Sequence, residues 1–324
     1  MATFAHSSNH YTNALSEEKI TSISNINYDK PKRIDSGVAV KLLGSKQDWC
    51  LKGTNELFKF LVILDGHGKG NVVNKLKGLD WNTILLEHNE RPDHLILNIN
   101  EYLSIDNSTS TSKPADNFRD GTTCSIVKMY DTYIECYTIG DSQVGIKIND
   151  NYFYTTNHDA DNKDEVTRLV RDESVVITDT WKSEILNDND ITMVKGKYFD
   201  FPVANNDKKD RIAMTRSLGH NYNDKFSTLQ EFEIFRIDYT KNDDVIIIAA
   251  TDGLWDVVHD KNLILDTFHE EAKTVKAHIA LTRLINRTEN KWTQKWNYYW
   301  EGELKEQTRF QNPDDIGIGY LVHI

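Results

Sequence analysis

The 324-residue sequence has few cysteines and no long apolar run, and each shortage excludes a class of protein. Its three cysteines, Cys50, Cys124 and Cys136, are too few and too scattered for a disulfide framework or a zinc site. No segment approaches the roughly 18 consecutive apolar residues of a membrane-spanning helix, and the first residues do not follow the pattern of a signal peptide. We therefore expect an intracellular, cytoplasmic protein that binds no membrane.

Basic residues are also in short supply, because 38 lysines and arginines face 50 acidic residues and give a formal net charge of -12. This balance argues against general nucleic-acid binding and is compatible with recruitment of cations. No linker rich in proline or glycine divides the chain. We expect a monomer with a weakly ordered segment at 1–25, rich in Ser, Asn and Thr, and one domain at 26–324 with insertions near 170–210 and 288–310.

One apolar run, Leu61–Leu64, is typical of a strand buried on both faces, and it stops at Asp65-Gly66-His67-Gly68. A carboxylate at that point is costly to bury unless it is paired or coordinates a cation. The glycines allow a tight turn and let the backbone offer a carbonyl to a ligand. The simpler interpretation is a strand that ends in a polar turn, so a second site of the same kind is needed.

A second site of this kind lies at 245–258, where another apolar run ends in Asp252-Gly253 and a further acid, Asp256, follows. Two strand-end carboxylates far apart in sequence predict neighbouring strands that bring them together. Oxygen ligands of this type suit Mg²⁺ or Mn²⁺. A third acid, Asp141, ends the second strand of a predicted hairpin built from 121–130 and 133–139.

The remaining chain contains predicted helices at 71–79, 91–103 and 262–286 and a polar surface flap at 170–210. An aromatic cluster follows at 292–300, and we interpret it as a satellite core, with a partner surface as the alternative. Lys30, Lys32 and Arg33 form a basic cluster beside Asp35, ahead of a predicted strand at 37–43. The simpler interpretation of that cluster is a solvated run of charge.

Taken in order, these segments resemble the metal-dependent protein phosphatases of type 2C, which act on phosphoserine and phosphothreonine. The resemblance covers about 35–322 and rests on short motifs that are each weak alone but specific in this order. The matching segments are Asp65-Gly66-His67-Gly68, Asp120-Gly121-Thr122-Thr123, Ile139-Gly140-Asp141-Ser142, Thr155 with His158, Glu165 with Arg168, Thr215-Arg216-Ser217-Leu218-Gly219, Ala250-Thr251-Asp252-Gly253-Leu254-Trp255-Asp256 and Asp314-Asp315-Ile316.

The resemblance implies an α+β fold, with a central β-sandwich of two antiparallel sheets flanked by helices in four α-β-β-α layers. It implies two Mn²⁺ or Mg²⁺ ions, with Asp65, Asp252 and Asp314 around one and Asp65 with the Gly66 carbonyl at part of the second. Asp35 corresponds to an early acid near the second metal. Asp141 and Asp256 would join Asp252 in a weaker third site.

The activity implied is hydrolysis of phosphoserine and phosphothreonine in proteins by direct attack of a metal-bridging water or hydroxide, with His67 as general acid. Two cations would neutralise the phosphate and lower the pKa of that water, so no cysteine or serine nucleophile is needed. An alternative role for His67 is that of a donor that only supports the metal site.

Several positions depart from the family pattern. Ile34 precedes Asp35 where many members have Glu, Asn157 and His220 stand where the family has Asp, and Asp315 stands where it has Asn. The phosphate-binding arginine is missing at its usual spacing, which leaves Lys30 and Arg33 as candidates for contact with the substrate phosphate.

Two functions are therefore compatible with the sequence. One is an active Ser/Thr phosphatase with a phosphoprotein substrate, and the other is a catalytically silent domain that binds phosphoproteins or a regulatory partner. A nucleotide-binding enzyme is disfavoured, because neither GxxxxGK[ST] nor GxGxxG follows a predicted strand.

Overall fold

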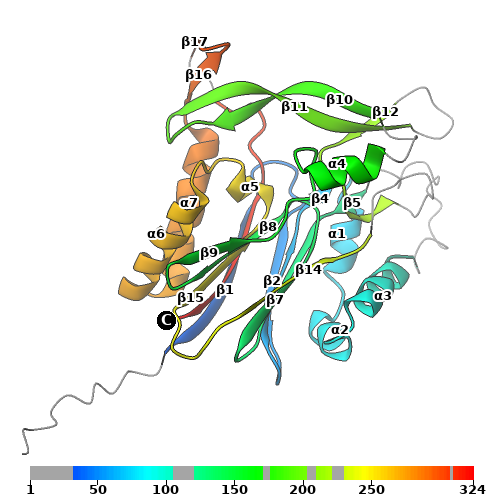
Figure 1. Cartoon of the computed structure of the whole chain (residues 1–324), viewed down its shortest axis with the longest axis vertical. Coiled ribbons are helices and arrows are strands. Elements are labelled where there is room, and N and C mark those ends of the chain that lie inside the picture. Colours follow the sequence, from blue (N-terminus) through cyan, green and yellow to red (C-terminus); the bar gives the residue numbers. More distant parts are fainter. Residues whose placement is uncertain (1–31, 105–119, 171–175, 203–208, 221–229, 307–308) are drawn as a thin grey trace, which may run out of the picture. The chain divides into compact units, whose positions relative to one another are not determined.

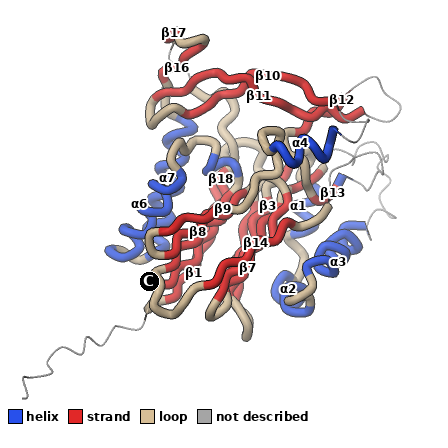
Figure 2. Tube along the Cα trace, viewed as in Figure 1, coloured by secondary structure: helices blue, strands red, loops and turns tan. Residues whose placement is uncertain are grey.

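Two antiparallel sheets pack face to face at the centre of the computed structural model (Figures 1 and 2). The structure describes residues 32–104, 120–170, 176–202, 209–220, 230–306 and 309–324, and residues 32–324 form one compact unit. One sheet has the order β1 (Ile34–Lys41), β18 (Ile316–His323), β15 (Val245–Ala250), β8 (Gln143–Ile148) and β9 (Asn151–Tyr154). The other has the order β14 (Glu233–Asp238), β7 (Tyr133–Ile139), β6 (Cys124–Met129), β3 (Lys59–Leu64) and β2 (Trp49–Thr54).

Strand β3 is buried on both faces, as its apolar run predicts. Leu61 and Ile63 point into the core between the sheets, together with Ile247 and Leu321 of the opposite sheet. Successive side chains of a strand point to opposite faces, so Phe60, Val62 and Leu64 belong to a second cluster under the helices. The strand thereby joins two cores.

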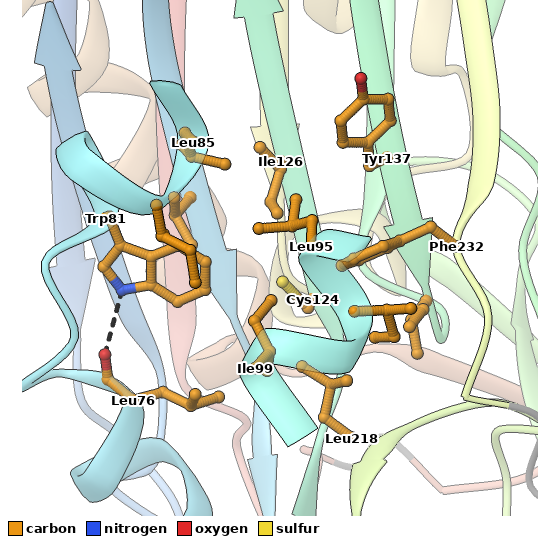
Figure 3. Close-up of a cluster of buried hydrophobic side chains, with 14 of the residues drawn as sticks. Leu76, Trp81, Leu85, Leu95, Ile99, Cys124, Ile126, Tyr137, Leu218 and Phe232 are labelled. Atoms are coloured by element: carbon orange, nitrogen blue, oxygen red, sulfur yellow. Dashed lines mark hydrogen bonds between the residues drawn. The ribbon is translucent and has the colours of Figure 1, made fainter. Parts of the chain in front are cut away.

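The second cluster lies between one sheet and three helices, α1 (Asn71–Leu76), α2 (Trp81–Glu87) and α3 (Pro92–Ser104). Figure 3 shows part of it, with the Trp81 indole N–H donating to the Leu76 carbonyl at 3.0 Å. Leu95, Ile96, Ile99 and Leu103 are buried along α3, which confirms the predicted apolar stripe.

Helices α5 (Asp252–Trp255), α6 (Lys261–Thr274) and α7 (Ala277–Thr293) pack on the outer face of the other sheet. The predicted four-layer α-β-β-α sandwich is confirmed. The prediction of one helix at 262–286 is wrong, because the chain leaves the helical conformation at Val275 and Lys276. The break lets α6 and α7 each bury an apolar face against the sheet.

A small sheet and a long hairpin complete the fold. The small sheet joins β4 (Gly66–His67), β5 (Gly121–Thr122) and β13 (Leu218–Gly219). The hairpin corresponds to the predicted flap and consists of β10 (Val176–Ile185) and β11 (Asp190–Pro202), with β12 (Lys209–Ile212), β16 (Asn297–Trp300) and β17 (Glu303–Leu304) added at its sides. Helix α4 (Lys163–Val170) precedes it.

Trp292 and Trp296 of the aromatic cluster are buried and contact Phe310 edge-on, as in a satellite core. Within the described residues, no helix is both long and apolar enough to cross a membrane. The segment predicted to be weakly ordered, 1–25, lies outside the described residues.

Candidate metal and phosphate site

Strand register brings two acids together at one end of the first pair of strands. Asp48 directly precedes β2 and Asp65 directly follows β3, and Trp49 is paired with Leu64 across the antiparallel ladder. The two carboxyl groups interact with one another. Sequence reasoning identified Asp65 and missed Asp48.

The other sheet delivers three acids to the same end of the sandwich. Asp141 lies two residues before β8, Asp252 lies two residues after β15, and Asp314 lies two residues before β18. Gln143 pairs with Ala250, and Ala250 pairs with Ile318, so these strand ends are neighbours. Carboxylate oxygens of Asp65, Asp141 and Asp252 all lie within 4.8 Å of one another.

Gly253 allows the close approach that places Asp252 beside the 314–315 segment. A Cβ atom at this position would lie 1.8 Å from the Asp315 carbonyl oxygen, so only glycine fits without moving backbone. The hydroxyl of Thr251 also donates to Asp48 at 2.7 Å, and its backbone N–H donates to the Gly317 carbonyl. These contacts fix Asp48 and Asp252 relative to each other.

His158 holds the turn that carries Asp141. Its Nδ1 accepts the Gly140 N–H at 3.2 Å, and its Nε2 lies 2.9 Å from the Glu233 carboxylate. Gly140 has a φ of 95°, a conformation that favours glycine. His158 therefore has a positioning role at the turn before Asp141.

Asp315 organises the loop that leads to Asp48. Its fully buried carboxylate accepts three backbone N–H groups at 2.8 Å, from Leu43, Gly44 and Gln47, and the Ser45 hydroxyl at 3.1 Å. Two carboxylate oxygens can accept four donors, whereas an asparagine at this position would bring only one acceptor oxygen. The departure from the family's Asn is therefore explained by local hydrogen bonding.

Burial and mutual repulsion raise the pKa values of the clustered acids. Burial, followed by the charge of neighbouring carboxylates, raises the pKa of Asp65 and of Asp252 well above the ordinary range. Burial also raises the pKa of Asp48 to about 7 and, with Asp256, that of Asp141 to about 7. The pKa of Asp314 is raised by burial as well. The site thus concentrates negative charge that water cannot fully solvate.

This donor set fits hard divalent cations. One oxygen of Asp141 and one of Asp252 are buried and have no hydrogen-bond partner in the described chain. Carboxylate oxygens without donors, gathered within 4.8 Å, are ligands that Mg²⁺ or Mn²⁺ would use. A cation would satisfy the orphaned oxygens and offset the repulsion.

Asp256 lies on the exposed rim of the site, where two lysines moderate its charge. Partial desolvation of its carboxyl group, followed by the charge of Asp314, raises the pKa of Asp256 to about 6. Lys182 and Lys261 oppose this shift. Lys182 comes from the flap strand β10 and is paired with Asp161, and Lys261 donates to Gln143 at 2.5 Å. The charge of Lys182 therefore links the flap strand β10 to Asp256 at the edge of the site.

The structure does not bring Asp35 to the cluster, and this expectation is corrected. In the antiparallel pair β1–β18, Lys41 is opposite Ile316 beside the site, whereas Asp35 is opposite Val322 near the other end. Asp35 interacts there with Tyr320 and accepts the Ser36 N–H. Ile34, opposite His323, is equally remote, whereas Asp48 lies beside Asp65 at the acidic end of the sandwich.

The basic candidates for phosphate contact are also remote where they are described. Arg33 donates to the Ala272 carbonyl at 3.3 Å, and Lys32 pairs with Asp244 at 2.5 Å. Both lie at the Asp35 end of β1, so the assignment of Arg33 to the phosphate is wrong in this structure. Lys30 lies outside the described residues.

His67 follows Asp65 by two residues and forms a pair with His220. Their Nε2 atoms are 2.8 Å apart, and burial, followed by the charge of His220, lowers the pKa of His67 to about 3. The Asp120 carboxylate accepts the Lys69 N–H and the Asn71 amide, which closes the turn after His67. Asp120 thus has a structural role beside the site.

Glu165 ties the flap-side segments together rather than binding a ligand. Burial opposes its ionisation, but Arg216, Arg168 and Thr215 hold its pKa at about 2. The Arg216 and Arg168 guanidinium groups donate to it at 2.6 and 2.8 Å, and the Thr215 hydroxyl at 2.6 Å. The E-x-x-R segment is therefore explained by this buried ion-pair network.

A sequence profile described as Protein phosphatase 2C matches residues 32–290. The chain belongs to this family. No curated protein sequence gives a significant match. The phosphatase 2C assignment agrees with the order of the motifs and with the shared end of the sandwich where the acids meet.

Solved structures with a similar fold have low sequence identity to this family member. A C. elegans sex determining protein is 15% identical with a TM-score of 0.57, and the match covers 90% of this chain and 65% of that one, a little under two thirds of its length. The serine-threonine phosphatase 2C of Toxoplasma gondii is 15% identical with a TM-score of 0.56, covering 91% and 96%. Serine/threonine phosphatase Stp1 from Staphylococcus aureus is 15% identical with a TM-score of 0.52, covering 90% and 95%. At these identities the similarity concerns the fold.

Proposed function

We propose that this protein is a metal-dependent phosphatase that hydrolyses phosphoserine and phosphothreonine in proteins. The proposal is carried by one observation: Asp65, Asp141 and Asp252, from three separate strand ends, place carboxylate oxygens within 4.8 Å of one another. A cluster of this kind is costly to fold without cations. Membership of the phosphatase 2C family supports the same reaction class.

The residues that would hold two Mn²⁺ or Mg²⁺ ions are Asp48, Asp65, Asp252, Asp314 and the Gly66 carbonyl. Asp141 and Asp256 would join Asp252 in a weaker third site. When bound, such ions neutralise a phosphate dianion and lower the pKa of water so that hydroxide is available as the nucleophile.

His67 would protonate the leaving seryl or threonyl oxygen. It lies two residues after Asp65, in the short strand β4 that follows the acidic turn. Its low pKa means that it is neutral in the free protein at pH 7. A bound phosphate dianion favours the imidazolium form, because an opposite charge at close range raises a histidine pKa. The substrate would therefore bring about the protonation that its own cleavage requires.

The test is hydrolysis of 4-nitrophenyl phosphate and of a phosphothreonine peptide, with Mn²⁺ or with EDTA. We expect turnover of both substrates with Mn²⁺ and none with EDTA. The variant Asp150→Asn is a matched control, because Asp150 is an exposed acid in the β8–β9 turn. Its turnover should equal that of the wild type, so a general effect of charge is excluded.

A catalytically silent, phosphate-binding domain is the second candidate, and one observation favours it. The described basic residues of the 30–33 cluster lie at the Asp35 end of β1, so they do not supply the phosphate contact expected of them. A protein that binds the phosphothreonine peptide but never releases inorganic phosphate with saturating Mn²⁺ would establish this role.

A further inference from the structure

The geometry around Gly121 assigns a function to His220. We propose that His220 is a positioning residue, which holds the His67 ring in place through the Nε2–Nε2 hydrogen bond. This inference rests on the proposed function, since it concerns the acid in that reaction.

Strand pairing brings the two histidines together over one glycine. His67 of β4 and Gly219 of β13 are both opposite Gly121 of β5, and His220 follows Gly219. The two rings are 4.9 Å apart between centroids and inclined by 31°. A Cβ atom on Gly121 would lie 2.3 Å from Nε2 of His67 and 2.6 Å from Nε2 of His220. Only glycine at this position leaves room for the pair.

The backbone presents His220 in an unusual conformation. Its φ is 61°, after Gly219 with a φ of 97°, and its N–H donates to the Asp120 carbonyl at 2.8 Å. A left-handed conformation disfavours a histidine relative to glycine or asparagine. The side chain is only 2% exposed, whereas His67 is partly exposed. His220 is therefore the fixed, inner member of the pair.

The hydrogen bond to His220 engages one of the two ring nitrogens of His67. His220 engages Nε2, and Nδ1 of His67 is enclosed without a hydrogen-bond partner in the described chain. Within the described chain, the contact with His220 is therefore the hydrogen bond that fixes the orientation of the His67 ring.

The experiment is a double-mutant cycle with His67→Ala and His220→Asn. Asparagine tolerates the left-handed conformation but is too short to replace the imidazole at the His67 ring. We expect His220→Asn to slow the phosphothreonine peptide about tenfold more than 4-nitrophenyl phosphate, because a phenolate leaves without a proton. In the double variant, His220→Asn should add no further loss to that of His67→Ala.

Two further variants separate positioning from folding. Gly121→Ala changes neither histidine but pushes the rings apart, and it should reproduce the substrate selectivity of His220→Asn. His269→Asn removes a buried histidine of α6 and should leave the ratio of the two substrates unchanged. Equal losses on both substrates, or additive losses in the double variant, would overturn the assignment.

A readout independent of activity keeps this inference distinct from the proposed function. If the wild type hydrolyses neither substrate with Mn²⁺, the proposed function and the proton-transfer step both fail, and imidazole ¹H–¹⁵N spectra then test the positioning contact itself. The His67 Nε2 signal should shift in His220→Asn and stay unchanged in His269→Asn. An unshifted signal in His220→Asn contradicts the positioning role.

Discussion

Asp48→Asn should make the metal-free protein more stable and the metal-loaded protein less so. Asp48 is 4% exposed, accepts the Thr251 hydroxyl at 2.7 Å and lies among the charges of Asp314 and Asp315. Without a cation, its negative charge costs folding free energy. With a cation bound, the same carboxylate would act as a metal ligand.

The size of the effect follows from the pKa of Asp48, which burial raises from 3.8 to about 7. A carboxyl group whose pKa is higher in the folded state loses its stabilising contribution as the pH rises through that value. Relative to a carboxyl group with the ordinary pKa, Asp48 then lowers the free energy of unfolding by about 4 kcal/mol at pH 8 and by about 2 kcal/mol at pH 5. An asparagine amide left without an acceptor costs roughly 1–3 kcal/mol of this gain.

The net expectation is a variant more stable than the wild type by roughly 1–3 kcal/mol in EDTA at pH 8, and about equal in stability at pH 5. For a domain of this size, each kcal/mol changes the melting temperature by about 2 °C. Saturating Mn²⁺ at about 100 times its Kd would add about 2.7 kcal/mol to the wild type. The variant should gain clearly less, so its advantage in melting temperature shrinks as Mn²⁺ is added and reverses once the difference in gain exceeds the advantage in EDTA.

The assay is thermal unfolding of both proteins at pH 5 and pH 8, with EDTA or with a series of Mn²⁺ concentrations. Asp150→Asn, an exposed charge removal, controls for net charge and should behave like the wild type under all conditions. If Asp48→Asn is less stable than the wild type in EDTA at pH 8 and gains as much from Mn²⁺, then Asp48 is a structural acid and the reasoning is wrong.

Three further outcomes are expected. Asp65→Asn and Asp252→Asn should each lower turnover at saturating Mn²⁺ by at least about 10³-fold, since each removes a charge shared within the cluster; near-normal turnover in both would refute the site. His67→Ala should slow a phosphoserine peptide roughly 10²-fold more than an aryl phosphate, and equal losses would leave His67 as a supporting donor only. Asp315→Asn should lower the free energy of unfolding by about 1–3 kcal/mol and weaken Mn²⁺ binding in calorimetry, because the loop before Asp48 loses acceptors; unchanged Mn²⁺ affinity would separate the loop from the site.

The sequence predicted those parts of the site that local pattern determines. Asp65 and Asp252 each follow a fully apolar run and precede a glycine, so strand, end and turn can all be identified within about ten residues of sequence. Asp141 was located differently, as the acid at the end of the second strand of a predicted hairpin. Burial on both faces of β3 and β15 was also predictable, because neither run alternates with polar residues.

Asp48 was missed because its position depends on contacts distant in sequence. The loop before it is held by the Asp315 carboxylate, and Asp48 faces Asp65 only through the β2–β3 register. Asp35 lies at the start of β1 and Asp48 directly precedes β2, and the sequence does not reveal which strand end lies at the site. The signal that distinguishes them is the run 49–54, a short strand ahead of β3 that the prediction did not include.

The acids of the cluster differ in whether a nearby lysine offsets their negative charge. The strongest influences on Asp65 and Asp252 are burial and other carboxylates, so a bound cation would offset their charge. Desolvation and the charge of Asp314 also raise the pKa of Asp256, but Lys182 of the flap and Lys261 offset part of its charge. A cation held by Asp141 and Asp256 would compete with Lys182 for the same carboxylate, and Lys182 is anchored on β10 through Asp161. Ions at the inner acids would therefore stabilise the fold, whereas an ion at the rim would be coupled to the position of the flap.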